Sequence, residues 1–156
     1  MQYKHKQIGW LTYGLLGSID IVILVLLVYL SKTESVPKVT IAIVTVAFVV
    51  LALATWFFSS LTTEVSNESV TAKFGPGFIR KEIPFSEISE VSVVKNKWWY
   101  GWGIRVIPGG WLLNVSGLDA VEIRRKDKGI IRIGTDEPQK LLQAIEAHSA
   151  QYKPVE

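Results

Sequence analysis

Residues 8–61 read IGWLTYGLLGSIDIVILVLLVYL, SKTESVPK and VTIAIVTVAFVVLALATWFFSSL, two apolar spans joined by a short polar connection. Each span, 8–30 and 39–61, holds about 23 residues, and roughly 20 helical residues cross the apolar core of a bilayer. Every backbone N–H and C=O inside that core must be satisfied within its own segment, so each span should be a helix. The sequence therefore predicts a transmembrane hairpin. A buried helix pair in a soluble protein is the alternative.

The composition divides the chain into two parts. Residues 1–61 are almost wholly apolar, whereas residues 62–156 have the mixed texture of one small globular domain. We therefore expect a helical hairpin at 1–61 and a cytosolic domain at 62–156. That domain carries 13 Lys and Arg against 12 Asp and Glu, without the basic excess of a nucleic-acid-binding protein. The absence of cysteine excludes disulfides, thiolate metal sites and a cysteine nucleophile.

The charges beside the spans predict the orientation of the hairpin. Lys4, His5 and Lys6 precede the first span, and positive flanks favour the cytoplasmic side. A hairpin places both termini on one side, where Trp10 and Trp56 would share the membrane interface. We expect a multi-pass protein of a bacterial-type cytoplasmic membrane with both termini in the cytoplasm.

Asp20 is the one charged residue inside the two spans. A carboxylate near the middle of a bilayer costs about 2.5–3.5 kcal/mol on insertion scales, so Asp20 should face protein. Antiparallel pairing predicts that it lies near Val49 and within a turn of Thr45. Small residues on its side of the helix allow close packing, along the stripe Gly9, Tyr13, Gly17, Asp20 and Leu24. Asp20 is either a proton, ion or partner site, or a protonated or hydrogen-bonded residue that fixes helix packing.

After Leu61 the pattern changes from helical runs to short alternating segments separated by turn residues, with turns predicted at 67–68 and 75–77, which is typical of an antiparallel β fold. The last element differs. Asp136 and Gln139 have capping-box spacing, Pro138 suits a first helical turn, and apolar residues recur at helical spacing at Leu141, Leu142, Ile145 and Tyr152. The sequence predicts about seven antiparallel strands followed by one amphipathic helix.

This arrangement resembles the bacterial pleckstrin-homology-like (PH-like) domains that follow paired transmembrane helices. The motifs that carry the resemblance are Ile83-Pro84-Phe85-Ser86-Glu87-Ile88 before Val91-Ser92-Val93, then Gly103-Ile104-Arg105, Asp119-Ala120-Val121-Glu122-Ile123, and Ile133-Gly134-Thr135-Asp136-Glu137-Pro138. The resemblance covers residues 62–150 and implies a partly open β-barrel capped by its helix, used as a binding or adaptor platform. Many PH domains bind phosphoinositides through basic residues at the first hairpin turn. Here the turn at 66–69 has an acid and no Lys or Arg.

Residues with catalytic chemistry are sparse. The only histidines are His5 in the N-terminal tail and His148, which we place on a solvated helix face. No His or carboxylate pair has metal-ligand spacing, and no nucleophile motif occurs. We expect neither an enzyme nor a cofactor or metal.

One segment has an unusual density of aromatic residues beside cations. The residues that we predict to contact a membrane or a partner are Lys95, Lys97, Trp98, Trp99, Tyr100, Trp102 and Arg105. Indoles beside lysines suit a loop at an anionic leaflet or a protein-binding surface. The alternative is that the tryptophans fill the open end of a small barrel. A second basic run, residues 124–128, is interpreted as a solvated hairpin tip.

The sequence thus favours a hairpin that anchors a PH-like adaptor domain in a membrane-associated complex, with another membrane protein or a second copy of this chain as partner. Two alternatives stay open. The domain could bind anionic lipid headgroups through Lys95, Lys97 and Arg105, or the chain could be a transporter or enzyme accessory subunit that uses Asp20.

Overall fold

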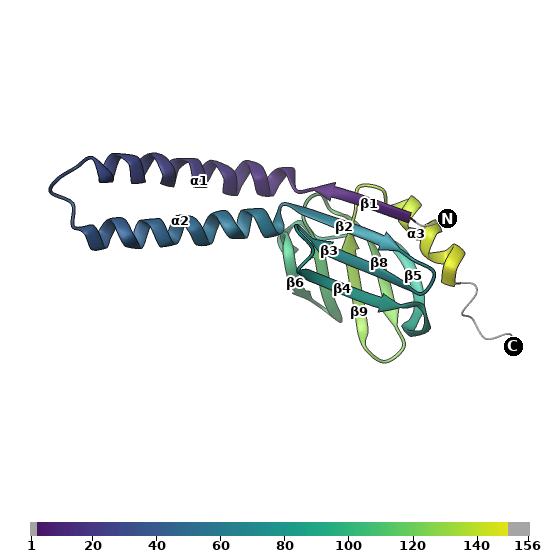
Figure 1. Cartoon of the computed structure of the whole chain (residues 1–156). Helices are drawn as coiled ribbons and strands as arrows, with labels where there is room; N and C mark the ends of the chain where they lie inside the picture. Colours follow the sequence, from purple (N-terminus) through teal and green to yellow (C-terminus); the bar gives the residue numbers. More distant parts are fainter. Residues whose placement is uncertain (1–2, 150–156) are drawn as a thin grey trace, which may run out of the picture.

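The computed structural model of the chain describes residues 3–149, which form a long helical hairpin, two β-sheets and a C-terminal helix (Figure 1). The hairpin consists of α1 (Trp10–Ser31) and α2 (Lys38–Phe58). Both helices are long and apolar enough to cross a membrane, and almost none of their surface is buried by the rest of the chain. They project away from the sheets (Figure 1), so they are not the core helices of a globular domain. Their bounds are a little shorter than the predicted spans 8–30 and 39–61.

The first sheet begins with a strand that the sequence did not predict. β1 (Tyr3–Ile8) pairs antiparallel with β2 (Ser60–Val65), so the segment before α1 belongs to the sheet and is no free tail. β3 (Ser69–Phe74) and β4 (Ile79–Pro84) complete this sheet in the order β1-β2-β3-β4. The predicted turns at 67–68 and 75–77 lie between these strands. Sheet A, as we call it, therefore holds both ends of the hairpin.

The second sheet, sheet B, has the order β5-β8-β9-β7-β6. Its strands are β5 (Ile88–Lys95), β6 (Gly103–Ile107), β7 (Gly110–Asn114), β8 (Asp119–Arg125) and β9 (Gly129–Gly134). Short 3₁₀ turns, η1 (Phe85–Glu87) and η2 (Trp98–Tyr100), precede β5 and β6.

Eight strands follow α2 among the described residues, close to the expected number of about seven. The expectation that all of them are antiparallel is wrong, because β7 pairs in parallel with β9. The parallel pair arises because the β8–β9 hairpin places β9 between β7 and β8. β9 runs opposite to β8, which itself runs opposite to β7, so β9 must run parallel to β7. The sheets also remain two separate layers and do not close into a barrel.

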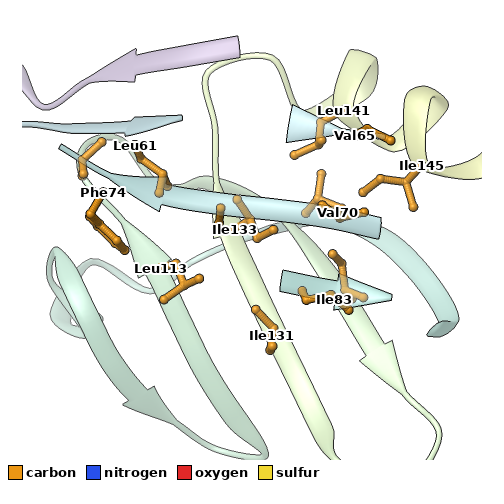
Figure 2. Packing of buried hydrophobic residues seen from close by; sticks show 14 of the residues in the cluster. Leu61, Val65, Val70, Phe74, Ile83, Leu113, Ile131, Ile133, Leu141 and Ile145 are labelled. Atoms are coloured by element: carbon orange, nitrogen blue, oxygen red, sulfur yellow. The ribbon is translucent and has the colours of Figure 1, made fainter. Parts of the chain in front are cut away.

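The core lies between the two sheets and is closed at one end by α3 (Pro138–Ser149). Leu141 and Ile145 of α3 pack beside Val65 and Val70 of sheet A (Figure 2). The predicted apolar positions of this helix are confirmed through Ile145, whereas Tyr152 lies outside the described residues. Such burial contributes roughly 1.5–3 kcal/mol for each aliphatic side chain.

The prediction that His148 lies on a solvated helix face is wrong, because its side chain is buried. Its ring stacks on Phe85 with centroids 6.1 Å apart and planes 7° from parallel. The Nδ1 atom lies 2.8 Å from the carbonyl oxygen of Ala144, one turn earlier in α3. A histidine can replace an apolar residue here because one ring face is covered and one nitrogen is hydrogen-bonded.

Candidate interaction surface at the base of the hairpin

The hairpin joins the sheets without a flexible linker. Gly9, between β1 and α1, donates its N–H to the carbonyl oxygen of Ser59 at 2.7 Å, between α2 and β2. Thr12 in the first turn of α1 donates to the carbonyl oxygen of Val115 at 3.3 Å, and Ser116 donates to that of Ile8 at 3.2 Å. Both sheets therefore contact the hairpin at this end, which we call the base.

The turn between β3 and β4 also lies against the base. A Cβ atom on Gly75 would approach the carbonyl oxygens of Phe57 and Trp56 to 2.6 and 2.8 Å, and Gly75 has φ of +47°. Only glycine tolerates both conditions. The turn brings the exposed ring of Phe78 to 6.2 Å from that of Phe57.

Exposed aromatic side chains therefore gather at the base. Trp10 begins α1, Trp56 lies in the last turn of α2, and Phe78 lies in the turn between β3 and β4, next to Phe57. Aromatic rings are enriched at the interface between a bilayer and water. This arrangement fits a membrane surface that passes through the base.

The predicted contact residues extend from Lys95, the last residue of β5, through the connection between β5 and β6 to Arg105 in β6. The η2 turn in this connection is closed by the N–H of Tyr100, which bonds the carbonyl oxygen of Lys97 at 3.0 Å. Trp98 and Trp99 are 71% and 61% exposed, with their rings edge to face at 5.9 Å. These two rings therefore do not fill the open end of the sheets, which was the alternative interpretation of the tryptophans. The ammonium of Lys97 lies 5.1 Å from the centre of a Trp99 ring, a cation–π distance.

The second half of this connection turns toward α1. Arg105 donates from Nε to the carbonyl oxygen of Trp102 at 2.9 Å. Both residues line a groove of about 560 Å³, whose opposite wall includes Leu11 and Leu15 of α1. The indole Nε1 of Trp102 is buried and has no hydrogen-bond partner among the described residues. The connection that begins with the exposed tryptophans therefore ends against the hairpin.

Asp20 lies apart from this surface, inside the hairpin. Its Oδ2 accepts a hydrogen bond of 2.9 Å from Thr55, not from Thr45, which bonds the carbonyl oxygen of Ile41 in its own helix. Side chains lean toward the start of their own helix, so in an antiparallel pair the two lean toward each other. Asp20 consequently bonds Thr55, which lies nearer the base than Val49, its predicted neighbour.

The predicted close packing along the small-residue stripe is absent at Gly17, where a Cβ atom would meet nothing within 4 Å.

Several charged side chains outside this surface form pairs that link neighbouring elements of the domain. Arg132 on β9 donates from Nε to Glu122 on β8 at 2.8 Å, and both side chains are largely buried. His5 on β1 lies 2.6 Å from Asp136 and 3.4 Å from Glu137, just before α3. In residues 3–149 no group of three or more His, Asp or Glu could hold a metal ion.

The basic run at 124–128 is only partly the solvated tip that we expected. Lys128 pairs with Glu87 at 2.6 Å, and the side chain of Arg125 is only 10% exposed. Alternation along β8 could have indicated this burial, because Arg125 continues the inward series of Val121 and Ile123.

Comparison with known proteins assigns no family to the chain. No protein-family model matches it, and no curated protein is significantly similar to it.

Proposed function

We propose that the chain is a membrane-anchored PH-like adaptor. The hairpin would cross the cytoplasmic membrane with both termini in the cytoplasm, and the Trp98–Trp102 segment would bind a second membrane-associated protein. The PH-like assignment is supported by two sheets of consecutive strands followed by one C-terminal helix that closes one end of the core. The parallel β7–β9 pair and the unclosed sheets depart from the expected barrel.

The observation that carries the proposal is the exposure of Trp98 and Trp99 on a fixed turn beside the base. Tryptophan is enriched among the residues that dominate protein–protein binding energy, because it offers a large contact area with few rotatable bonds. The two rings contact each other edge to face, and Lys97 places a positive charge over the Trp99 ring. A partner would therefore meet a preformed surface and lose little side-chain entropy on binding it.

The proposal is tested with a photo-crosslinking amino acid in place of Lys95, an exposed residue at the start of this connection. We expect a crosslink to one defined membrane-associated protein in cells, lost when Trp98→Ala and Trp99→Ala are combined in the same chain. The matched control places the crosslinker at Glu146, which is exposed on α3. Equal crosslinking from both positions, or crosslinks that survive the double substitution, would refute the adaptor surface.

The orientation has a separate test, because the chain contains no cysteine. A cysteine introduced at Ser35, in the connection between α1 and α2, should react with a membrane-impermeant maleimide in intact cells. A cysteine at Glu146 should react only after the cells are opened. The reverse pattern would place the sheets outside the cytoplasm.

A second candidate function is binding of anionic lipid at the inner leaflet, and the aromatic residues at the base favour it. Trp98 and Trp99 would then lie in the same interfacial layer as Trp10 and Trp56, with Lys95, Lys97 and Arg105 supplying charge. Brominated lipids should quench the fluorescence of Trp98 and Trp99. This quenching is measured as the difference between the wild type and the Trp98→Phe and Trp99→Phe variants. The matched control is Trp111→Phe. No quenching beyond that of Trp10 and Trp56 would exclude membrane seating of the segment.

A further inference from the structure

The inward face of sheet B extends beyond sheet A at the β6–β7 edge. Val106 pairs with Trp111 and Ile104 with Leu113, and the parallel register places Trp111 beside Ile131. Side chains of paired residues share one face of a sheet, so all five point to the side that forms the core. Leu113 and Ile131 are buried, but Val106 and Trp111 are 74% and 49% exposed. The core is therefore uncovered at this edge.

The uncovered edge is the end of the sandwich that α3 does not reach. Leu141 and Ile145 of α3 lie by Val65 and Val70, whereas Phe74 and Leu113 lie at the other side of the cluster (Figure 2). A cavity of about 250 Å³ opens there between the sheets. Its apolar wall consists of Phe74, Ile79, Ile104, Trp111, Leu113 and Ile131. Apolar cavities of roughly 150 Å³ already hold a benzene ring, so this one accommodates a larger apolar group.

Two of the three cations that line this cavity lie on inward faces. Lys81 pairs with Ala72, between the pairs Phe74–Ile79 and Val70–Ile83, all of whose members face the core. Lys81 is nevertheless an exposed residue, so its ammonium is open to a ligand, and it forms no ion pair within 4 Å with another described residue. A cation on the core face of a strand breaks the alternation that packing alone would favour.

The second inward cation is Arg125 on β8, which reaches the same cavity from sheet B. Its guanidinium lies 3.9 Å from a carboxylate oxygen of Glu87 and donates to the carbonyl oxygen of Lys128. Its Nε is buried and has no hydrogen-bond partner among the described residues. Arg80 is the third cation, and no carboxylate lines the cavity. Glu87 also pairs with Lys128, so its single charge does not balance this group.

We propose that the inter-sheet cavity binds an anionic single-chain amphiphile. The acyl chain would occupy the apolar wall, and a carboxylate or phosphate would bond the ammonium of Lys81 and the free Nε–H of Arg125. A charge-assisted bond of this kind would satisfy the buried Nε–H of Arg125, which is costly to leave without a partner. The inference goes beyond the adaptor role and does not depend on it.

The position of the cavity gives such a ligand a route from the bilayer. Ile104 lines both the cavity and the groove against Leu11, Leu15 and Leu16 of α1. An acyl chain that leaves the membrane along α1 would therefore meet continuous apolar surface as far as Leu113.

The test uses the full chain in phosphatidylcholine nanodiscs and a palmitate analogue with a diazirine on its chain. We expect light-induced labelling of the peptides that contain Ile104, Trp111 and Ile131, and competition by unlabelled palmitate. Lys81→Glu should reduce this labelling roughly tenfold or more, as expected for loss of a charge-assisted hydrogen bond. The matched control is Lys6→Glu, an equal charge change at an exposed position on β1, which should leave the labelling unchanged.

Competitors identify the source of the headgroup. Stronger competition by palmitate than by 1-palmitoyl-lysophosphatidate assigns a free fatty carboxylate, and the reverse order assigns a membrane phospholipid product. Hexadecanol should compete at least tenfold less well than either, because it has the chain without the charge.

Three outcomes would overturn the inference. They are labelling confined to α1 and α2, labelling unaffected by Lys81→Glu in a chain that keeps its wild-type circular dichroism, and equal competition by hexadecanol. A dimer in solution that Val106→Glu dissociates, with no labelling of the cavity peptides, would show instead that a second copy of the chain covers this edge.

Discussion

The hydrogen bond between Thr55 and Asp20 allows a quantitative test of the hairpin. The Thr55 hydroxyl lies 2.9 Å from Oδ2 of Asp20 and 3.0 Å from the carbonyl oxygen of Leu51. Thr55→Val keeps the shape of the side chain and removes this donor. Hydrogen bonds between membrane helices contribute about 0.6 kcal/mol on average and about 1.7 kcal/mol at most. We therefore expect Thr55→Val to weaken helix association roughly 3- to 18-fold.

The structure supplies a matched control in the same helix. Thr45 is exposed, and its hydroxyl bonds only the carbonyl oxygen of Ile41 in its own helix. Thr45→Val therefore makes the same chemical change without touching α1. We expect it to alter helix association by less than about 0.3 kcal/mol, within the usual range for surface substitutions.

Association of the two helices can be followed by energy transfer between dyes in mixed micelles as the SDS fraction rises. The dyes would be attached to cysteines introduced at Val22 and Val46, which are exposed on α1 and α2. A double-mutant cycle with Asp20→Ala and Thr55→Val isolates the pair. A coupling energy below about 0.3 kcal/mol, or equal effects of the two threonine substitutions, would refute the assignment of this hydrogen bond as a stabilising contact.

A substitution of Asp20 can distinguish a structural role of this residue from a functional one. Asp20→Asn retains an oxygen acceptor for Thr55 and removes a charge that costs about 2.5–3.5 kcal/mol in a bilayer. If Asp20 only fixes the packing of the hairpin, this variant associates at least as tightly as the wild type and assembles fully with its partners. Tight association combined with lost activity would assign a proton or ion site to the Oδ1 atom, which is buried without a partner among the described residues.

Three further perturbations test the sheets. Gly110→Ala should destabilise the domain by more than about 2 kcal/mol in urea titrations, because the added Cβ would lie 1.8 Å from the carbonyl oxygen of Ile130 across the parallel pair; a neutral effect would contradict that register. Burial raises the pKa of Tyr3 to about 12, so the unfolded chain ionises first and thermal stability should fall between pH 10 and 12; Tyr3→Phe should remove this loss. The hydrogen bond from Lys4 is the main cause of the lowered pKa of Glu64. The stability that ionised Glu64 gives the folded state is therefore complete above about pH 4.5, and it is lost as the pH falls through the lowered pKa. The protection factors of the β1 amides, corrected for the pH dependence of intrinsic exchange, should fall there in the wild type and stay constant in Glu64→Gln.

Features encoded within short stretches of the sequence were predictable. The hairpin, the turns at 67–68 and 75–77, and the C-terminal helix each depend on neighbouring residues, because length, turn chemistry and helical spacing are local signals. The unpredicted features depend on distant partners. β1 is short and polar, and its partner β2 lies beyond the whole hairpin.

The parallel β7–β9 pair could not be predicted either, because nothing in the sequence of either strand specifies the strand with which it pairs. Of the candidate contact residues, the density of tryptophan was visible in the sequence, but the exposure of Trp98 and Trp99 depends on how η2 turns away from the core. Alternation along β4 could have placed Lys81 on the face of Ile79 and Ile83, but its position beside a cavity depends on how sheet B packs against sheet A.

The pairing of β1 with β2 determines how the hairpin can hold the sheets. A single linker would let a domain rotate about its anchor, but here both ends of the hairpin continue into adjacent strands of sheet A. The bond between Gly9 and Ser59 ties the two helix–strand transitions together, and Thr12 ties α1 to the end of β7. Rotation of the sheets against the helices would break these contacts together. In a membrane-spanning hairpin, the tilt of the helices would therefore fix which surface of the domain meets the bilayer. Because Ile104 and Trp102 lie against α1, the open end of the sandwich and the aromatic connection keep a fixed position relative to the base.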